Sequence, residues 1–157
     1  MSGKINKIST CGVLTAIAIT FSYVEYLIPI PVAVPGVKLG VANIAIIAVL
    51  YMIGNVEAVI VNLLRILIMG ILFGNFYSFM FSLAGGLLSI VLMIVSKYTK
   101  KLSIIGVSIV GAVTHNIGQI IMAVFLLNTP QIAYYLPILM IVGVFTGICN
   151  GFIAKKI

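Results

Sequence analysis

The sequence predicts an all-α integral membrane protein whose six transmembrane helices form a single domain over residues 1–157. Three observations support this prediction. Of the 157 residues, 63% are hydrophobic and only 7% are charged, whereas about a quarter of the residues of a soluble domain carry a charge. Apolar runs recur along the whole chain, and no polar stretch is long enough to fold separately. The basic residues lie mostly in short connectors, where they set the orientation of a chain in the bilayer.

The apolar runs define the expected helices. A helix needs about 20 apolar residues to cross a hydrocarbon core about 30 Å thick. Six runs approach this length, and we expect helices at about 8–30, 39–53, 56–73, 76–96, 103–127 and 132–154. The second and third runs are short and separated only by Gly54 and Asn55, which predicts a tight antiparallel pair. The connector PIPVAVPGVK at 29–38 contains three prolines, which oppose helix formation, and it serves either as a stiff linker or as a lid.

The lysines predict the orientation of these helices. Six crossings place one group of them on a single side of the membrane: Lys4, Lys7, Lys97, Lys100, Lys101, Lys155 and Lys156. Lys38 then lies on the other side, and Arg65 lies within the third helix. The positive-inside rule makes the lysine-rich side cytoplasmic, with both termini on it, in the bacterial cytoplasmic membrane. This orientation role accounts for the basic excess, so we expect no nucleic-acid partner.

Polar side chains inside the apolar runs predict a binding pocket in the outer half of the bundle. A charged residue at mid-helix costs about 2.5–3.5 kcal/mol on insertion scales, so it usually faces the bundle interior or a wet cavity. The candidate substrate-binding residues are Glu25, Lys38, Asn43, Arg65, Asn75, Tyr77, His115, Asn116 and Gln119. His115 and Gln119 are four residues apart and share a helical face, as do Asn62 and Arg65, three apart. The alternative is that these side chains satisfy one another and hold the helices together.

Arg65 is the strongest candidate for contact with a ligand. It either forms a buried ion pair with Glu25 or provides a cationic socket for a carboxylate or phosphate, because its planar guanidinium suits both. The charges of Glu25, Lys38 and Arg65 sum to a positive value, which favours an anionic or zwitterionic solute. Tyr77 adds an aromatic face for stacking.

Missing residues argue against an enzyme. The chain has no aspartate and two glutamates, whereas a prenyl-diphosphate synthase needs clustered carboxylates to hold magnesium. His115 is the only histidine, which rules out a Cys/His zinc set, and there is no P-loop glycine–lysine signature. We therefore expect no catalytic residue, no metal and no cofactor.

Small residues form two stripes that let helix backbones approach closely. In the sixth run, Gly143, Gly147 and Gly151 share one face, where we expect internal helix packing. In the first run, Gly12 and Ala16 are four residues apart. There, docking of a separate membrane partner competes with internal packing.

Several segments together carry a family resemblance: VPGVKLGVANI at 34–44, LLRILIMGILFG at 63–74, SLAGGLLS at 82–89, IGVSIVGAVTHNIGQ at 105–119 and YYLPIL at 134–139. With them the chain resembles the Gx transporter family, also named heptaprenyl diphosphate synthase component I. That family is similar to the substrate-binding S components of energy-coupling factor transporters. The resemblance implies an S-component-like bundle with an outward-facing pocket and a lid in the first connector. It also implies docking through Gly12 and Ala16 onto a transmembrane coupling protein that two cytoplasmic ATPases drive.

The leading hypothesis is therefore a subunit that binds a small anionic or zwitterionic organic solute, such as a vitamin or cofactor precursor, for uptake. Arg65 anchors the negative group, and His115, Asn116 and Gln119 orient polar edges. The alternative is a membrane scaffold that positions a quinone-, flavin- or isoprenoid-linked redox or synthesis partner without transporting anything.

Overall fold

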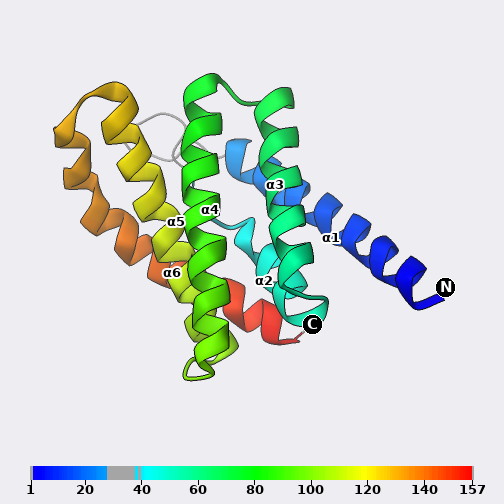
Figure 1. Cartoon of the computed structure of the whole chain (residues 1–157). Helices are drawn as coiled ribbons and strands as arrows, with labels where there is room; N and C mark the ends of the chain where they lie inside the picture. Colours follow the sequence, from blue (N-terminus) through cyan, green and yellow to red (C-terminus); the bar gives the residue numbers. More distant parts are fainter. Residues whose placement is uncertain (1, 28–37, 39, 157) are drawn as a thin grey trace.

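The computed structural model describes residues 2–27, 38 and 40–156, and within this part the chain is a bundle of α-helices (Figure 1). The elements are α1 (Ser2–Leu27), α2 (Asn43–Met52), α3 (Asn55–Leu72), α4 (Phe76–Thr99), α5 (Ile104–Leu127), the 3₁₀ helix η1 (Pro130–Tyr135) and α6 (Leu136–Lys156). The predicted all-α membrane bundle is confirmed. Of the connector 29–38, only Lys38 lies among the described residues.

One expected crossing is too short to span a membrane. Within the described part of the chain, five helices are long and apolar enough to cross. The helix α2 has 10 residues, a length of about 15 Å at 1.5 Å per residue, which is half of the hydrocarbon core. Every residue from Asn43 to Leu50 is buried, and α2 contacts α1, α3, α5 and α6. The second apolar run therefore forms a half-length helix covered by protein rather than a complete span.

The stripe of glycines predicted in the sixth run packs α6 against α5. A Cβ added at Gly147 would lie 2.6 Å from the Cα of Ile109, and one at Gly151 would lie 2.6 Å from the Cα of Ile105. A Cβ at Gly143 would lie 2.9 Å from Nδ2 of Asn116. The two backbones are thus too close for a side chain along this line, and α6 packs on α5 at these glycines.

The C-terminal end of α2 is joined to the end of α4 by a lysine. Nζ of Lys97 donates hydrogen bonds to the carbonyl of Leu50 at 2.6 Å and to Oδ1 of Asn55 at 3.1 Å. It also lies 5.1 Å from the centre of the Tyr51 ring, within the range of a cation–π contact. The α4–α5 connection and the C-terminus lie at the same end of the bundle (Figure 1).

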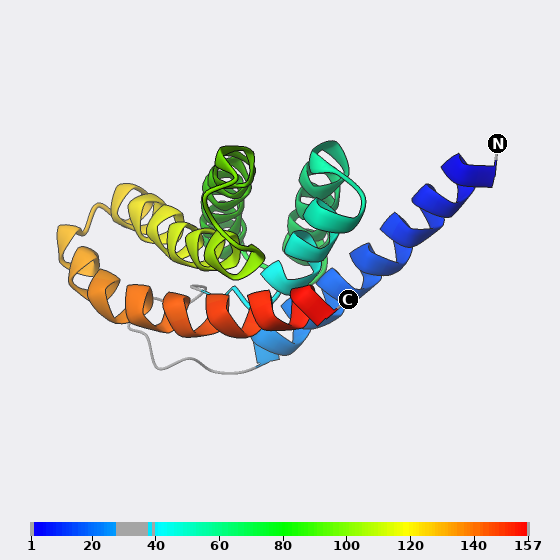
Figure 2. The ribbon, with the colours of Figure 1, turned by 90° about the horizontal axis from the view of Figure 1, so that it is seen from below.

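The helix α1 diverges from the rest of the bundle. Its N-terminal half projects away from the other helices (Figures 1 and 2), and it packs on α2 and α3. A Cβ at Gly12 would meet no atom within 4 Å. Gly12 and Ala16 are both exposed. Neither residue of the predicted docking stripe is therefore used for packing within the chain.

Candidate functional site

A small cavity lies among four helices and Lys38. It is lined by Ser22 of α1, Arg65, Ile66 and Met69 of α3, Ser82 of α4, His115 of α5, and Lys38. Its volume is about 10 Å³, which is the space that about one water molecule needs. The cavity thus combines side chains from distant parts of the sequence.

Polar atoms around this cavity have no hydrogen-bond partner. They are Oγ of Ser22, Nε of Arg65, Oγ of Ser82 and Nδ1 of His115. The four residues are 2%, 5%, 7% and 2% exposed, so bulk water does not hydrate them. Leaving one buried polar group unsatisfied costs about 1–3 kcal/mol, and such groups are rare in native proteins. Four of them around one cavity indicate a place that water or a ligand completes.

Arg65 is positioned by its neighbour on α3. Its Nη2 donates to Oδ1 of Asn62 at 2.8 Å, and Nδ2 of Asn62 donates to the carbonyl of Gly86 at 3.0 Å. These bonds orient the guanidinium while Nε stays unpartnered at the cavity. Asn62 therefore acts as a support for Arg65, at the spacing of three residues that places side chains side by side on a helix.

Glu25 does not form an ion pair with Arg65. Among the described residues, Lys7 and Glu57 form the one ion pair whose nitrogen and oxygen atoms lie within 4.0 Å of each other. Instead, Oε1 of Glu25 accepts the backbone N–H groups of Gly40 and Val41. Gly40 has a φ of +85°, a left-handed conformation that favours glycine. Glu25 thus holds the turn that leads into α2, and it is not within ion-pair distance of Arg65.

Lys38 is held from α5 through its backbone. Its N–H donates to Oε1 of Gln119 at 2.7 Å, and its carbonyl accepts from Nε2 of Gln119 at 3.0 Å. Two residues on, the carbonyl of Gly40 accepts from Nδ2 of Asn150 in α6 at 3.1 Å. Burial lowers the pKa of the Lys38 ammonium to about 8, helped by the charge of Arg65 and opposed by Glu25. The ammonium is therefore mostly charged at neutral pH.

His115 contacts both the cavity and a neighbouring helix. Its ring makes a hydrogen bond to the backbone of Gly85 in α4, while Nδ1 has no partner. A Cβ at Gly85 would lie 2.7 Å from the backbone oxygen of His115. Gly85, the first glycine of SLAGGLLS, therefore permits the close approach of α4 to α5 that brings His115 and Ser82 to the same cavity.

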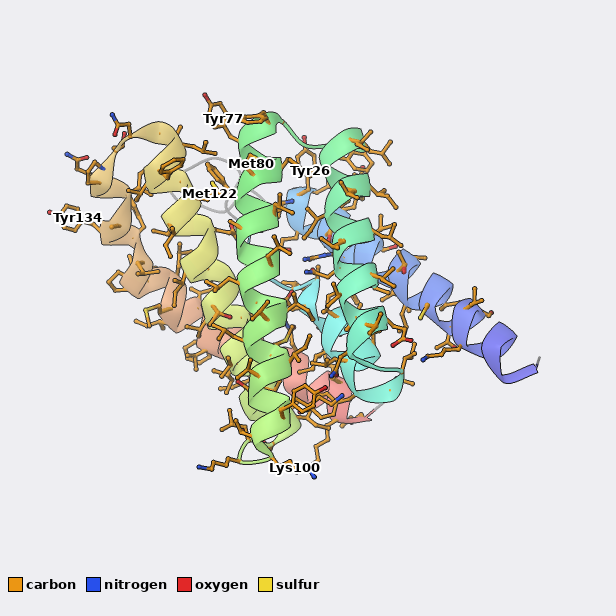
Figure 3. All side chains as sticks on the ribbon, viewed as in Figure 1. Tyr26, Tyr77, Met80, Lys100, Met122 and Tyr134 are labelled. Atoms are coloured by element: carbon orange, nitrogen blue, oxygen red, sulfur yellow. The ribbon has the colours of Figure 1, made fainter. Side chains whose placement is uncertain are left out.

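The remaining predicted residues divide into two groups. Asn116 is buried and donates to the carbonyl of Leu139 at 2.6 Å, and Asn43 is buried near Gly40 with Nδ2 unpartnered. In contrast, Oδ1 of Asn75 accepts from the backbone N–H of Ser78 at 2.8 Å and caps α4. Tyr77 is 47% exposed and points outward from the end of α4 (Figure 3). Asn75 and Tyr77 are not part of the cavity.

Sequence reasoning missed Ser22 and Ser82. Serine is unremarkable in a membrane helix, because its hydroxyl can donate to a carbonyl of its own helix. The available signal was spacing, since Ser22 lies three residues before Glu25 on the same face of α1.

A second, larger hollow lies between α1 and α3. This α1–α3 groove has a volume of about 520 Å³ and is lined mainly by apolar residues, among them Ile8, Ile60 and Leu64. Gly12 also lines it, and the Lys7–Glu57 ion pair lies at its edge. The groove is separate from the cavity around Arg65.

No group of three or more His, Cys, Asp or Glu side chains that could hold a metal ion occurs among the described residues.

Comparison with known proteins identifies the family. The model of the family described as heptaprenyl diphosphate synthase component I matches residues 14–157, which include every residue that lines the cavity. No curated protein and no solved structure matches the chain. The family match covers far more than half of the sequence, and the chain therefore belongs to the heptaprenyl diphosphate synthase component I family.

Proposed function

We propose that this chain is the substrate-binding, S-component-like subunit of a transporter that takes up a small anionic or zwitterionic organic solute. One observation carries the proposal: four buried polar atoms without partners, from four different helices, surround a cavity beside the charged Lys38. A network with a purely structural role would pair these atoms with one another, because each unpaired group lowers stability. Arg65 and Lys38 supply the positive charge that attracts an anion.

Opening of the site involves the residues that lead into α2. The cavity has room for about one water molecule, so an organic solute binds only when lining groups move apart. Lys38 and Gly40 are held by Gln119, Asn150 and Glu25 through side-chain hydrogen bonds. These bonds can break and re-form without unfolding any helix. We propose that they close the site over a bound solute.

The proposed partners are a transmembrane coupling protein and two cytoplasmic ATPases. The exposed stripe of Gly12 and Ala16 on the projecting α1 supports this part of the proposal, because it offers a close approach to another helix. The description of the family as a component also fits a subunit of a larger assembly.

We further propose that the chain itself is not a catalyst, although its family is described as a synthase component. The two glutamates of the chain are used elsewhere: Glu25 accepts backbone N–H groups, and Glu57 pairs with Lys7. A carboxylate cluster that binds magnesium needs carboxylates side by side, and these two glutamates have different partners.

Native mass spectrometry of the purified chain tests the binding function. The wild-type protein should retain a small anionic or zwitterionic molecule, and Arg65→Ala should lose it while remaining folded in detergent. Tyr134→Ala is a matched control, because Tyr134 is 82% exposed and lies far from the cavity in η1. Retention of the same molecule by Arg65→Ala would show that Arg65 is not the anchor.

A second candidate function is a scaffold that positions a quinone-, flavin- or isoprenoid-linked partner without transport. The α1–α3 groove favours it, because its apolar walls and volume of about 520 Å³ suit an isoprenoid chain better than the small cavity does. Copurification separates the two functions. Coupling-factor ATPases in the complex would support transport, whereas a flavoprotein or a prenyltransferase would support the scaffold.

A further inference from the structure

We infer that the anchoring group of the ligand is a single carboxylate with a neutral hydrogen-bond donor, a hydroxyl or N–H, on the adjacent carbon, and not a phosphate or diphosphate. This inference rests on the proposed binding function, since it names the chemistry that the cavity around Arg65 would take. Three properties of the cavity lead to it: its charge, its donors and its one acceptor.

The charge of the site matches one carboxylate. Arg65 and Lys38 each bring one positive charge to the cavity, and the carboxyl group of Glu25 lies close enough to influence the charge of Lys38. A phosphate ester group carries about −1.5 to −2 at neutral pH, and a diphosphate carries more. Beside the Glu25 carboxyl group, either would bring more negative charge into a buried place than a carboxylate does, which is costly. A carboxylate brings a single negative charge, which the two cations can balance.

The donors of the site also match a carboxylate. An ionised carboxylate only accepts hydrogen bonds, through two oxygens. Nε of Arg65 and the hydroxyls of Ser22 and Ser82 are unpartnered groups that can donate, and the Lys38 ammonium lies beside them. The planar two-oxygen group is also smaller than a tetrahedral phosphate, so the groups that line the cavity need to move apart less to admit it.

His115 requires a donor in return. Its ring hydrogen-bonds the backbone of Gly85, and a neutral imidazole that donates through one nitrogen accepts through the other. Nδ1, which has no partner, is therefore the acceptor. In this arrangement the donors named above face the carboxylate, so we assign the donor to Nδ1 to a group on the carbon next to the carboxylate. A bound water is the competing donor, and the experiment separates the two.

The sequence provides two single-residue reporters for this test, because Arg65 is the only arginine and His115 the only histidine. The full chain in detergent is labelled with ¹⁵N at arginine and histidine and observed by NMR. The probes are lactate, propanoate, inorganic phosphate and pyrophosphate. Lactate and propanoate differ in the hydroxyl beside the carboxylate, so they form a matched pair.

We expect lactate to shift both the Arg65 Nε and the His115 Nδ1 signals. Propanoate should shift Arg65 alone and bind about tenfold more weakly, the usual effect of losing one hydrogen bond. Phosphate and pyrophosphate should bind more weakly than lactate. His115→Asn, which places an amide oxygen near the position of Nδ1, should keep the preference for lactate over propanoate, and His115→Leu should lose it.

Each other outcome has a distinct meaning. Equal binding of lactate and propanoate, with no change at His115, would overturn the inference in favour of a bound water while leaving the anion site of the proposed function intact. Tighter binding of phosphate or pyrophosphate would overturn the choice of carboxylate, again leaving an anion site. If none of the probes shifts the Arg65 signal, the proposed anion site fails, and the inference fails with it.

Discussion

The side chain of Gln119 and the backbone of Lys38 are joined by a reciprocal pair of hydrogen bonds. The Lys38 N–H donates to Oε1 of Gln119 at 2.7 Å, and Nε2 of Gln119 donates to the Lys38 carbonyl at 3.0 Å. Gln119 is fully buried, so no water competes for these bonds. A side chain in α5 thereby fixes a residue 81 positions earlier in the sequence, together with the charge that this residue carries.

Replacement of Gln119 by leucine should loosen this attachment. Gln119→Leu removes both bonds and leaves the N–H and carbonyl of Lys38 unpaired, which should lower the free energy of unfolding by about 1–3 kcal/mol. Thermal unfolding in detergent measures the loss, and amide hydrogen exchange at Lys38 should accelerate. Ile121→Leu is the control on the same helix, because Ile121 is 61% exposed. Unchanged exchange at Lys38 in the Gln119 variant would mean that other contacts hold this residue.

The pH dependence of the protein should reveal Lys38 through two effects of opposite sign. The ordinary lysine pKa of 10.5 is lowered to about 8 by burial and by Arg65, so between these values the unfolded chain binds more protons. Stability should therefore rise as the pH rises from 8 to 10.5. Anion binding should weaken over the same range, because the folded protein loses the Lys38 charge. Below pH 8 Lys38 is already charged when the anion binds. Near pH 8 the bound anion favours the charged form of Lys38, so binding should be accompanied by uptake of a proton.

The groups around Lys38 determine which variant tests this prediction. Glu25 of α1, Arg65 of α3 and His115 of α5 face the same region, and Glu25 is the one that favours the charged lysine. Lys38→Gln should therefore flatten both pH profiles above pH 8. Ligand affinity and unfolding are measured from pH 7 to 10.5 for both proteins. Identical profiles for wild type and Lys38→Gln would assign the titration to another group.

Two glycine substitutions should have different effects on stability. In Gly147→Ala, the new Cβ would lie 2.6 Å from the Cα of Ile109, a backbone atom that cannot move without separating α5 from α6. Such overpacking costs about 1–3 kcal/mol. In Gly12→Ala, the new Cβ meets nothing within 4 Å, and alanine favours the helix by up to about 1 kcal/mol. Thermal unfolding measures the stability of the two variants under the same conditions. An equal loss of stability in both would contradict the packing role of Gly147.

The sequence was most informative where burial in lipid is costly. Arg65, His115 and Gln119 were predicted to face the interior because their polar groups are expensive in hydrocarbon, and all three are buried. Asn75 and Tyr77 were predicted with them because a polar residue at a helix end looks the same whether it caps the helix or lines a pocket. In the structure, Asn75 caps α4. Only the fold distinguishes these two roles.

Composition alone could not predict two other features, the burial of α2 and the roles of the hydroxyl groups. The apolar sequence of α2 has the same character whether lipid or protein covers it, so the burial of Asn43 to Leu50 by protein was not predictable. Hydroxyl groups are ambiguous in a similar way. Thr15 donates to the carbonyl of Cys11 and Thr114 to that of Val110, four residues earlier in each case. Ser22 has no such bond in the structure, and in the sequence only its spacing from Glu25 distinguished it from these threonines.

Docking of the coupling protein on α1 leads to a prediction about assembly. Gly12→Leu should disrupt the complex with a coupling protein, because a leucine side chain fills the space through which a second helix approaches Gly12 and Ala16. The fold of the chain itself should survive, since Gly12 has no neighbour within 4 Å of a Cβ position.

Cys149→Leu is the matched small-to-large control, at an exposed position of α6. Copurification of the tagged chain with its membrane partners measures the effect. A partner retained by Gly12→Leu at the wild-type level would place the docking surface elsewhere, while a partner lost from both variants would indicate that any enlargement of the lipid-facing surface blocks assembly.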